Sequence, residues 1–444
     1  MFDIWTMKNI TVNNYCNTTN VICNEDGEII ELSLSKLAIE DIYDNSICNI
    51  KSLKNLNMSH NNLTKIPYEI TNCTNLEVID ISHNSIQIIP DYINKLQHLK
   101  LLNISNNSIG KYKPIDELID LPQLLYLDIS NNNMQAPSAI LKSLPNLKYL
   151  DISGNLMYDS GRIINMDNLE TLLASRTVGT IMHDIDAPNL VRYIGDYMYE
   201  GTKGERATRP LRPLFSNVSI IPVIKARNLR YISLRGSDRL YTSTVRYIIG
   251  RNKYLEYADF GDSKIVVSEL AAVKKKEPSK QGASSYRNGK SLKYVDVGGR
   301  LNNYDKDYDA SLSLFAPDNN IEYINASMHF NIFEWDEYDI KYNRLQVLDL
   351  HGFRSSNSLS INKILESAPN LVTLDLSKSS VYGNITNIKL PTSLKHLVLC
   401  DTTRIVGSIS DRVHGRMEFI YIAQSKIKPY HERTNCQTDG LCVI

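Results

Sequence analysis

Residues 76–90 read LEVIDISHNSIQIIP, with apolar residues at the first, fourth, sixth and eleventh places and Asn84 at the ninth. Twenty-three residues earlier the chain reads LKNLNMSHNNLTKIP, and twenty-three residues later it reads LKLLNISNNSIGKY. The same phrase therefore returns at a nearly constant interval. A fixed period of about 20–50 residues is the signature of a repeat architecture, in which each unit packs against its neighbours.

The first apolar residue of each phrase marks where a repeat begins. In the first part of the chain, the steps between these residues are 24, 23, 23, 25, 23 and 22 residues. Beyond Leu169 the pattern weakens, Leu190 is a poor match, and the phrase then resumes. The repeats begin at Ile29, Leu53, Leu76, Leu99, Leu124, Leu147, Leu169, Leu229, Leu255, Leu292, Ile321, Leu345, Leu371, Leu394 and Met417.

Phrases such as LKYLDISGNLM (147–157) and LVTLDLSKSSV (371–381) resemble leucine-rich repeats, whose pattern is L-x-x-L-x-L-x-x-N-x-L. The resemblance covers roughly residues 29–427. It implies an α/β repeat solenoid, a horseshoe with a parallel β-sheet on its concave side and short helical or irregular segments on its convex side. The residues are consistent with this architecture, because the alternating apolar residues Leu150 and Ile152 suit a strand with one buried face.

The ninth place of the phrase divides the solenoid into two parts. Up to about residue 176 it carries Asn, which can bond the backbone where the chain leaves the strand. Further on, the same column reads Ser237, Ser263, Arg300, Phe353, Ser379, Thr402 and Ser425. We therefore predict an N-terminal cap (1–28), regular repeats (29–176), irregular repeats (177–428) with inserted loops at about 203–213 and 266–290, and a C-terminal cap or tail (429–444).

The seven cysteines leave the cell compartment open. The segment YCNTTNVICNEDGEIIELSLS resembles the cysteine-bearing N-terminal cap of extracellular leucine-rich repeat proteins, which implies a Cys16–Cys23 pair. Cys436 and Cys442 bracket a short loop at the other end. Two end pairs suit an oxidising compartment, whereas the first residues lack the basic-then-apolar layout of a secretory signal, which favours the cytoplasm. Both localisations stay open.

Two columns of side chains are expected on the concave face. In this repeat the third and fifth places point outward from the strand, and a period of two puts both columns on one face. The third place carries Tyr126, Tyr149, Tyr231, Tyr257, Tyr294 and Tyr323, with Phe419 near the end. The fifth place carries Asp80, Asp128, Asp151, Asp259, Asp296, Asp349 and Asp375, with Asn57, Asn103 and Asn325 between them.

These two columns support either of two roles. Asp at the fifth place is common in the family that the chain resembles, and stacked aromatic residues stabilise neighbouring strands by a few tenths to about 1 kcal/mol each. Tyrosine also supplies a large, rigid contact area with a polar end, which suits protein recognition. For a protein partner, the predicted contact residues are Tyr126, Tyr149, Tyr231, Tyr257, Tyr294, Tyr323, Asp128, Asp151, Asp259 and Asp296.

Charge is unevenly distributed although Lys plus Arg and Asp plus Glu number 49 each. Residues 1–175 hold 12 Lys and Arg against 20 Asp and Glu, a net −8, whereas residues 202–290 hold 19 against 7, a net +12. Two loops, KGERATRPLRP (203–213) and VKKKEPSKQGASSYRNGK (273–290), contribute much of the positive charge. They make binding of nucleic acid or another polyanion an alternative, without any recognised nucleic-acid-binding fold beside them.

Motifs for catalysis or metal binding are missing from the sequence. There is no phosphate-binding glycine loop with its lysine, no HExxH and no nucleophile elbow. His60 and His83 share the eighth place of adjacent repeats and should be neighbours, but two imidazoles do not make a metal site. No apolar run reaches the roughly 18 residues that span a bilayer. We predict a non-enzymatic, cofactor-free protein that binds a protein partner; the alternatives are a secreted or receptor-like recognition module and the polyanion binder.

Overall fold

The computed structural model divides the chain into two compact units. Unit 1 comprises residues 1–214 and 220–227, and unit 2 comprises residues 215–219 and 228–444. The domain boundaries predicted above follow the regularity of the repeats and stay a prediction. The structure describes residues 16, 18–42, 46–110, 120–134, 144–157, 166–179, 187–197, 199–200, 212–213, 226, 228–236, 240–241, 245, 248–250, 252–263, 265–266, 290–299, 320–328, 341–354, 359–409, 417–422, 425–428 and 441–442.

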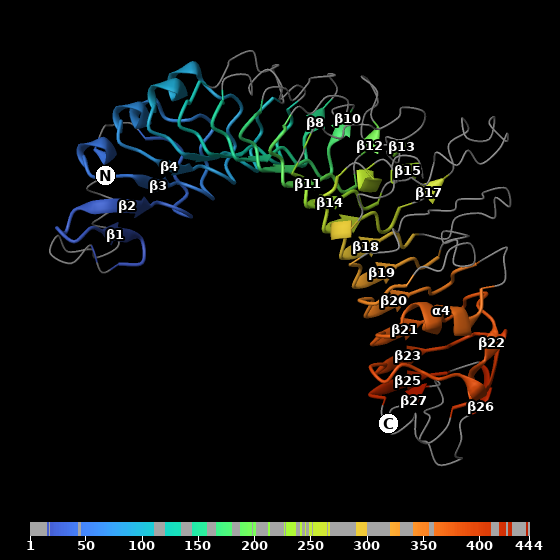
Figure 1. Cartoon of the computed structure of the whole chain (residues 1–444). Coiled ribbons are helices and arrows are strands. Elements are labelled where there is room, and N and C mark those ends of the chain that lie inside the picture. The colour runs from blue at the N-terminus through green and yellow to red at the C-terminus, as the bar shows by residue number, and fades with distance from the viewer. Residues whose placement is uncertain are drawn as a thin grey trace, which may run out of the picture. The chain divides into compact units, whose positions relative to one another are not determined.

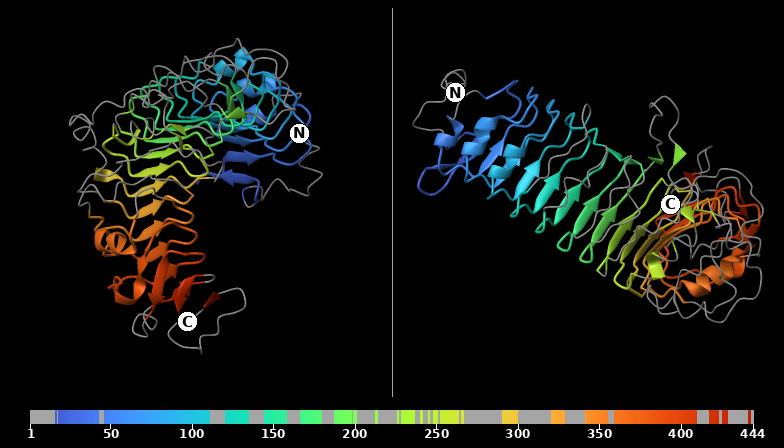
Figure 2. Two further views of the ribbon diagram at one scale, coloured as in Figure 1. Left: turned by 90° about the vertical axis from the view of Figure 1, so that its right-hand side faces the viewer. Right: turned by 90° about the horizontal axis from the view of Figure 1, so that it is seen from above.

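Unit 1 is a coil whose turns each contribute one strand to a parallel sheet (Figures 1 and 2). Its first strand, β1 (Val21–Cys23), pairs antiparallel with β2. All later neighbours are parallel and follow chain order. They are β2 (Ile29–Ser33), β3 (Asn55–Asn57), β4 (Val78–Asp80), β5 (Leu101–Asn103), β6 (Tyr126–Asp128), β7 (Tyr149–Asp151), β9 (Thr171–Leu173) and β11 (Arg192–Ile194).

Unit 2 repeats the same arrangement. Its parallel neighbours are β14 (Tyr231–Ser233), β16 (Tyr257–Asp259), β18 (Tyr294–Asp296), β19 (Tyr323–Asn325), β20 (Val347–Asp349), β21 (Thr373–Asp375), β23 (His396–Val398) and β25 (Phe419–Tyr421). The final strand, β27 (Leu441–Cys442), pairs antiparallel with β25. The parallel-strand repeat solenoid expected from the sequence is confirmed, and even the weakly matching Leu190 repeat forms a strand, β11.

Alternation along each strand builds the core. The middle residue of each three-residue parallel strand in the main sheets is buried, as is Leu32 in the longer β2, and its two neighbours point to the other side. In unit 1 these buried residues include Leu56, Ile79 and Leu102, which lie opposite one another in adjacent strands. The residues that begin the repeats are also buried from Leu53 to Met417, with at most 5% of their surface exposed. The apolar core is therefore continuous within each unit because it is assembled from the same places of successive turns.

The ninth-place Asn residues hold the turns of unit 1 together. Asn132 is typical: its Nδ2 donates to the backbone oxygens of Ile104, Ile129 and Ser130 at 3.0–3.1 Å, and its Oδ1 accepts from the backbone N–H of Ile109 at 3.1 Å. One side chain thus satisfies four backbone groups on adjacent turns. The predicted role is confirmed for the whole asparagine ladder, which consists of Asn61, Asn84, Asn107, Asn132 and Asn155.

Unit 2 fills the same column with residues that make fewer bonds. Thr402 Oγ1 donates to the backbone oxygen of Leu399 at 2.7 Å, and Ser425 Oγ donates to that of Ile422 at 2.7 Å. Phe353 is apolar and buried. Within the described part of the chain, the buried hydroxyl of Ser379 has no hydrogen-bond partner. Ser237 and Arg300 lie outside the described residues. The turns of unit 2 are therefore joined by fewer side-chain bonds.

Short helices and small sheets complete the turns on the side opposite the main strands (Figure 1). Unit 1 has the 3-10 helices η2 (Ile47–Asn49), η3 (Tyr68–Asn72) and η4 (Asp91–Lys95), and unit 2 has α4 (Ile361–Ser367) and η8 (Ile385–Asn387). The small sheets contain β8 (Leu156–Met157), β10 (Val178–Gly179), β12 (Tyr199–Glu200) and β13 (Arg212–Pro213) in unit 1. Those of unit 2 contain β15 (Leu240–Tyr241) and β17 (Ile265–Val266), and β22 (Gly383–Asn384), β24 (Ile405–Ser408) and β26 (Lys426–Lys428).

No helix in these described segments is long and apolar enough to cross a bilayer. The short helices and small strands of the return segments match the short helical or irregular segments expected from the repeat pattern.

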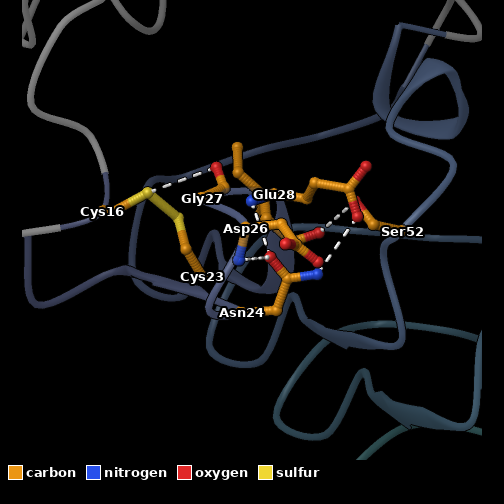
Figure 3. The surroundings of a disulfide bond; sticks show 8 residues. Cys16, Cys23, Asn24, Asp26, Gly27, Glu28 and Ser52 are labelled. Carbon is orange, nitrogen blue, oxygen red and sulfur yellow. Dashed lines mark hydrogen bonds between the residues drawn. A yellow bond between two sulfur atoms is a disulfide. The ribbon is translucent and has the colours of Figure 1, made fainter.

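Two disulfides strengthen the start of unit 1. Cys16 and Cys23 are joined as predicted, beside the β1–β2 hairpin (Figure 3). In the turn of that hairpin, Asn24 Oδ1 accepts from the backbone N–H groups of Asp26 and Glu28 at 3.1 and 2.8 Å. The second disulfide, Cys48–Cys73, was not predicted and joins the return segments of two adjacent turns. The predicted cysteine-bearing cap is confirmed, whereas Cys436 lies outside the described residues.

Candidate functional site

All ten predicted contact residues lie on one side of the main sheets. We call the sheet face the side on which the third- and fifth-place side chains project, away from the buried middle residue of each strand. In unit 1 it carries Tyr126, Tyr149, Asp128 and Asp151 on β6 and β7. In unit 2 it carries Tyr231, Tyr257, Tyr294 and Tyr323, with Asp259 and Asp296, on β14, β16, β18 and β19.

The tyrosines form stacked rows, because parallel strands in register place the same column side by side. In unit 1 the rings of Tyr126 and Tyr149 are 4.1 Å apart and nearly parallel. In unit 2 the four rings from Tyr231 to Tyr323 stack in sequence, with centroids 4.2, 4.1 and 4.3 Å apart. Since each inner ring is covered by its neighbours on both flat sides, its edge and hydroxyl remain for contact with solvent or a partner.

These phenols stay protonated around neutral pH. Burial raises the pKa of Tyr126 and Tyr149 in unit 1. It also raises the pKa of Tyr257, Tyr294 and Tyr323 in unit 2. Each row therefore presents neutral hydroxyls, which can both donate and accept hydrogen bonds. Tyr257 Oη, for example, donates to Asp259 Oδ2 at 3.4 Å.

The Asp and Asn residues of the fifth place share a structural role. One oxygen of each accepts a hydrogen bond from the backbone N–H two residues later, as Asp128 does from Ser130 at 2.9 Å. The same bond is made by Asn57 to Ser59 at 2.9 Å and by Asn103 to Ser105 at 3.1 Å. This bond explains why Asp and Asn alternate in the column. An Asp differs from an Asn only in the charge that it adds to the sheet face.

Unit 2 contains a partly buried ionic cluster that the sequence pattern did not reveal. Arg235 Nη1 lies 3.0 Å from Asp259 Oδ2 and 3.6 Å from Asp296 Oδ2, and its Nη2 lies 3.0 Å from Asp262 Oδ2. The side chains of Asp259 and Asp296 are only 5% and 6% exposed. Arg235 occupies the seventh place of its turn, where the turns of unit 1 from β2 to β9 carry Ser. An arginine at a place that carries serine in those turns was the feature of the sequence that could have indicated the cluster.

Glycine makes room for this guanidinium. Gly261 follows Asp259 at the seventh place of the next turn, and a Cβ there would lie 3.1 Å from three guanidinium atoms of Arg235. Asp296 remains incompletely compensated: its burial, opposed by the N–H of Gly298, raises its pKa to about 6. Two of the predicted contact residues, Asp259 and Asp296, are therefore occupied mainly by internal contacts.

The acidic residues of unit 1 have no such counterion. Within the described part of unit 1, Asp80, Asp128 and Asp151 take part in no ion pair. Burial, offset by hydrogen bonds from Ser153 and reinforced by the charge of Asp128, raises the pKa of Asp151. The sheet face of unit 1 therefore carries uncompensated negative charge.

A groove lies at the N-terminal end of this face. It has a volume of about 410 Å³ and is lined by residues of β1 to β6, among them Ile22, Glu31, Val78, Leu101 and Tyr126. Ile22 of the hairpin strand β1 is 51% exposed. The groove thus joins a predicted contact residue, Tyr126, to an apolar wall that the sequence pattern did not identify.

In parts of both units, the second place of the repeat carries alternating charges that pair with one another. Glu77 lies 3.0 Å from Lys54 and 2.6 Å from Lys100, and Glu256 lies 2.6 Å from Arg230 and 2.9 Å from Lys293. Hydrogen bonds from Lys100 and Lys54 lower the pKa of Glu77. Exposed pairs of this kind contribute little stability each, but they show that these cations are already engaged.

The described residues offer little that resembles a reaction centre. His351 Nδ1 lies 2.6 Å from Ser377 Oγ, and Ser377 Oγ donates to Asp375. A nucleophilic triad requires the histidine between the acid and the hydroxyl, whereas here the hydroxyl lies between the other two. His60 and His83 stack at 4.1 Å, as their shared place predicted. No group of three or more potential metal ligands occurs among the residues that the structure describes.

Two basic loops were predicted as an alternative site, for nucleic acid or another polyanion. Apart from residues 212–213, 266 and 290, residues 203–213 and 266–290 lie outside the described residues. Polyanion binding stays a prediction.

Comparison with known proteins identifies the repeat. Residues 31–173 match the family model described as a leucine-rich repeat region. A leucine-rich repeat protein of Leptospira interrogans is similar in structure, with a TM-score of 0.53 and 15% identity over 90% of this chain and 91% of that one. The structural similarity shows a shared fold, and at this low sequence identity it shows the fold alone.

Two further solved structures are more distant. The plant peptide hormone receptor RGFR1, solved in complex with RGF2, gives a TM-score of 0.48 and 14% identity over 93% of this chain and 68% of that one. The internalin InlF of Listeria monocytogenes gives a TM-score of 0.44 and 14% identity over 90% and 85% of the two chains. No curated protein matches the sequence.

Proposed function

We propose that this chain, of which residues 31–173 match a leucine-rich repeat model, is a non-enzymatic binding protein that holds a protein partner on its concave sheet face. The proposal rests chiefly on the stacked tyrosine rows. A row whose neighbouring rings are 4.1–4.3 Å apart forms a rigid surface of ring edges and neutral hydroxyls. Rigid, amphipathic side chains of this type lose little conformational entropy when they bind.

The predicted contact residues fall into two groups under this proposal. Tyr126, Tyr149, Asp128 and Asp151 would contact the partner in unit 1. In unit 2 the tyrosines would make the contacts, while Asp259 and Asp296 would mainly position Arg235, given their 5% and 6% side-chain exposure. Neither group requires a cofactor or a catalytic residue.

Site-specific photocrosslinking tests this proposal. A benzophenone amino acid replaces Tyr149 or Tyr294 on the sheet face, one position at a time, in the full chain. Matched controls carry it at Tyr68, which is 50% exposed on η3, and at Tyr382, which is 39% exposed beside β22. We expect crosslinks to a protein partner from the sheet-face positions and none from the controls. Equal crosslinking at all four positions, or crosslinking at the controls alone, would contradict the proposal.

A secreted or receptor-like recognition module is a second candidate, supported by the two disulfides of unit 1. Such bonds form and persist in oxidising compartments. Intact mass of the natively expressed protein, alkylated before and after reduction, tests this candidate. Protection of Cys16, Cys23, Cys48 and Cys73 from alkylation before reduction is the expected result. Alkylation of all four without reduction would rule the candidate out.

A further inference from the structure

The sheet face of unit 1 consists of three parallel rows of different chemistry. The third places from β4 to β7 carry an apolar row: Val78, Leu101, Tyr126 and Tyr149. The fifth places carry an acidic row, Asp80, Asp128 and Asp151, interrupted by Asn103. The seventh places carry serine throughout. Because strands in a sheet are about 4.8 Å apart, the rows from β4 to β7 extend over roughly 14 Å, the length of about four extended residues.

The acidic row has no cation of its own. From β2 to β9 the third, fifth and seventh places contain no Lys or Arg. The nearest lysines of the second place are engaged elsewhere: Lys54 and Lys100 pair with Glu77, and Lys148 pairs with Glu170. Each Asp of the row uses one oxygen for the backbone bond within its own turn. Among the described residues, the second oxygens of Asp80 and Asp128 remain available as acceptors, whereas Asp151 also accepts a hydrogen bond from the Ser153 side chain.

The groove gives the rows a defined end. Ile22 projects from β1 with 51% of its surface exposed, and the groove of about 410 Å³ between it and the strands also takes in Val78 and Leu101. An apolar side chain that enters this groove removes Ile22 from water, which is favourable in proportion to the area covered. Beside it, Asp80 also lines the groove and presents a carboxylate.

We propose that the sheet face of unit 1 binds an extended segment of a partner protein in which Lys or Arg side chains accompany apolar ones. The apolar side chains lie along the row from Val78 to Tyr149 and in the groove beside Ile22. The cationic side chains pair with Asp80, Asp128 and Asp151. This inference rests on the proposed function and adds the chemical class of the partner.

Unit 2 illustrates the pairing with a residue of its own. There Arg235 lies between Asp259 and Asp296, which occupy the same fifth place of adjacent turns, at 3.0 and 3.6 Å. A guanidinium therefore fits against two successive carboxylates of this column. In unit 1 the equivalent carboxylates, Asp128 and Asp151, are on adjacent strands without an internal guanidinium. A partner's arginine would supply the missing charge.

Peptide selection against the full chain tests the proposal. The probe is a phage library of random peptides of about 12 residues, longer than the rows when extended. We expect the enriched peptides to combine Lys or Arg with aliphatic or aromatic residues. Their binding should weaken as NaCl rises from about 0.05 to 0.5 M, because screening grows with ionic strength. It should also weaken about tenfold or more in the triple variant Asp80→Asn, Asp128→Asn, Asp151→Asn.

The triple variant is designed to leave the fold intact. An Asn at the fifth place makes the same backbone bond, as Asn57 and Asn103 do in adjacent turns. The matched control, Asp91→Asn, Asp120→Asn, Asp167→Asn, removes the same charge from exposed positions away from the sheet face. We expect it to bind the peptides as the wild type does. The single variant Leu101→Ser tests the apolar row and should also weaken binding.

The outcomes separate this inference from the proposed function. Enrichment of acidic or uncharged peptides, or unchanged binding of basic peptides by the triple Asn variant, would overturn the basic partner class. No enrichment at all would overturn an extended segment as the ligand. In either case, crosslinks from Tyr149 or Tyr294 to a protein would leave the proposed function standing. Loss of those crosslinks would overturn both.

Discussion

Replacing Asp296 by Asn should stabilise the protein at neutral pH, although it removes a carboxylate that lies near an arginine. The side chain of Asp296 is 6% exposed, and burial raises its pKa to about 6 from the ordinary 3.8. A difference of this size means that ionisation costs the folded state about 3 kcal/mol at neutral pH. Asn carries no charge and can accept the same hydrogen bond from Gly298 N–H, which is 2.8 Å long in the wild type.

The pH dependence follows from the raised pKa. Between the unfolded and folded pKa values the folded wild type binds more protons than the unfolded chain. The contribution of Asp296 to the stability is therefore greatest below about pH 4 and is lost as pH rises through about 6. The Asp296→Asn variant lacks this loss. Since an amide only approximates a protonated carboxyl group, we expect the variant to gain about 2 kcal/mol at pH 7.5 and almost nothing at pH 4.5.

Urea unfolding followed by far-ultraviolet circular dichroism at the two pH values measures this difference. The control is Asp262→Asn, which removes another carboxylate from Arg235 at a side chain that is 40% exposed. An exposed pair contributes less than about 1 kcal/mol, so this variant should be slightly destabilised at both pH values. If Asp296→Asn is less stable than the wild type at pH 7.5, Arg235 compensates the buried charge fully and the reasoning fails.

Three further predictions, two of them with a comparison variant, test the structure. Asn132→Ala leaves four backbone groups without their partner and should lower the free energy of unfolding by about 3 kcal/mol or more; Thr402→Val loses one bond and should lose only about 1 kcal/mol in the same urea titration. Removing the Cys48–Cys73 disulfide by the double Ser variant opens a loop with a sequence separation of 25 and should lower the thermal midpoint by an amount that corresponds to about 3 kcal/mol; an unchanged midpoint would contradict it. Gly110→Ala places a Cβ 2.9 Å from Asn133 O at a φ of +82° and should destabilise unit 1 by about 2 kcal/mol, whereas Gly27→Ala, with a φ of +80° but no atom within 4 Å, isolates the backbone strain.

Much of the fold was predictable because every turn carries the same pattern of buried and outward-facing residues. The position of Leu56 in one turn is repeated by Ile79 and Leu102 in the next two, so a local error in the pattern does not alter the register. The stacking of Tyr257 on Tyr294 follows from the same register. The confirmed Asn ladder follows from the hydrogen-bonding capacity of an amide at the end of a strand.

Features that depend on two different columns were not predictable in this way. Arg235 belongs to the seventh place and meets Asp259 and Asp296 of the fifth, so inspection of each column by itself misses the cluster. Cys48 and Cys73 lie in return segments of variable length, where the repeat fixes no register. Their separation of 25 is close to one repeat period, which was the available signal that they face each other on adjacent turns.

The alternating charges of the second place constrain how the number of repeats can change. Lys54, Glu77 and Lys100 succeed one another in three adjacent turns, as do Arg230, Glu256 and Lys293 in unit 2. Loss of the single turn that carries Glu77 would bring Lys54 next to Lys100, and loss of the single turn that carries Glu256 would bring Arg230 next to Lys293. Loss of the two turns that carry Glu256 and Lys293 would instead bring Arg230 next to Glu322. Like charges on neighbouring strands are destabilising, by about 0.2–1 kcal/mol per pair. This charged stretch of unit 2 therefore tolerates shortening by those two turns better than by one.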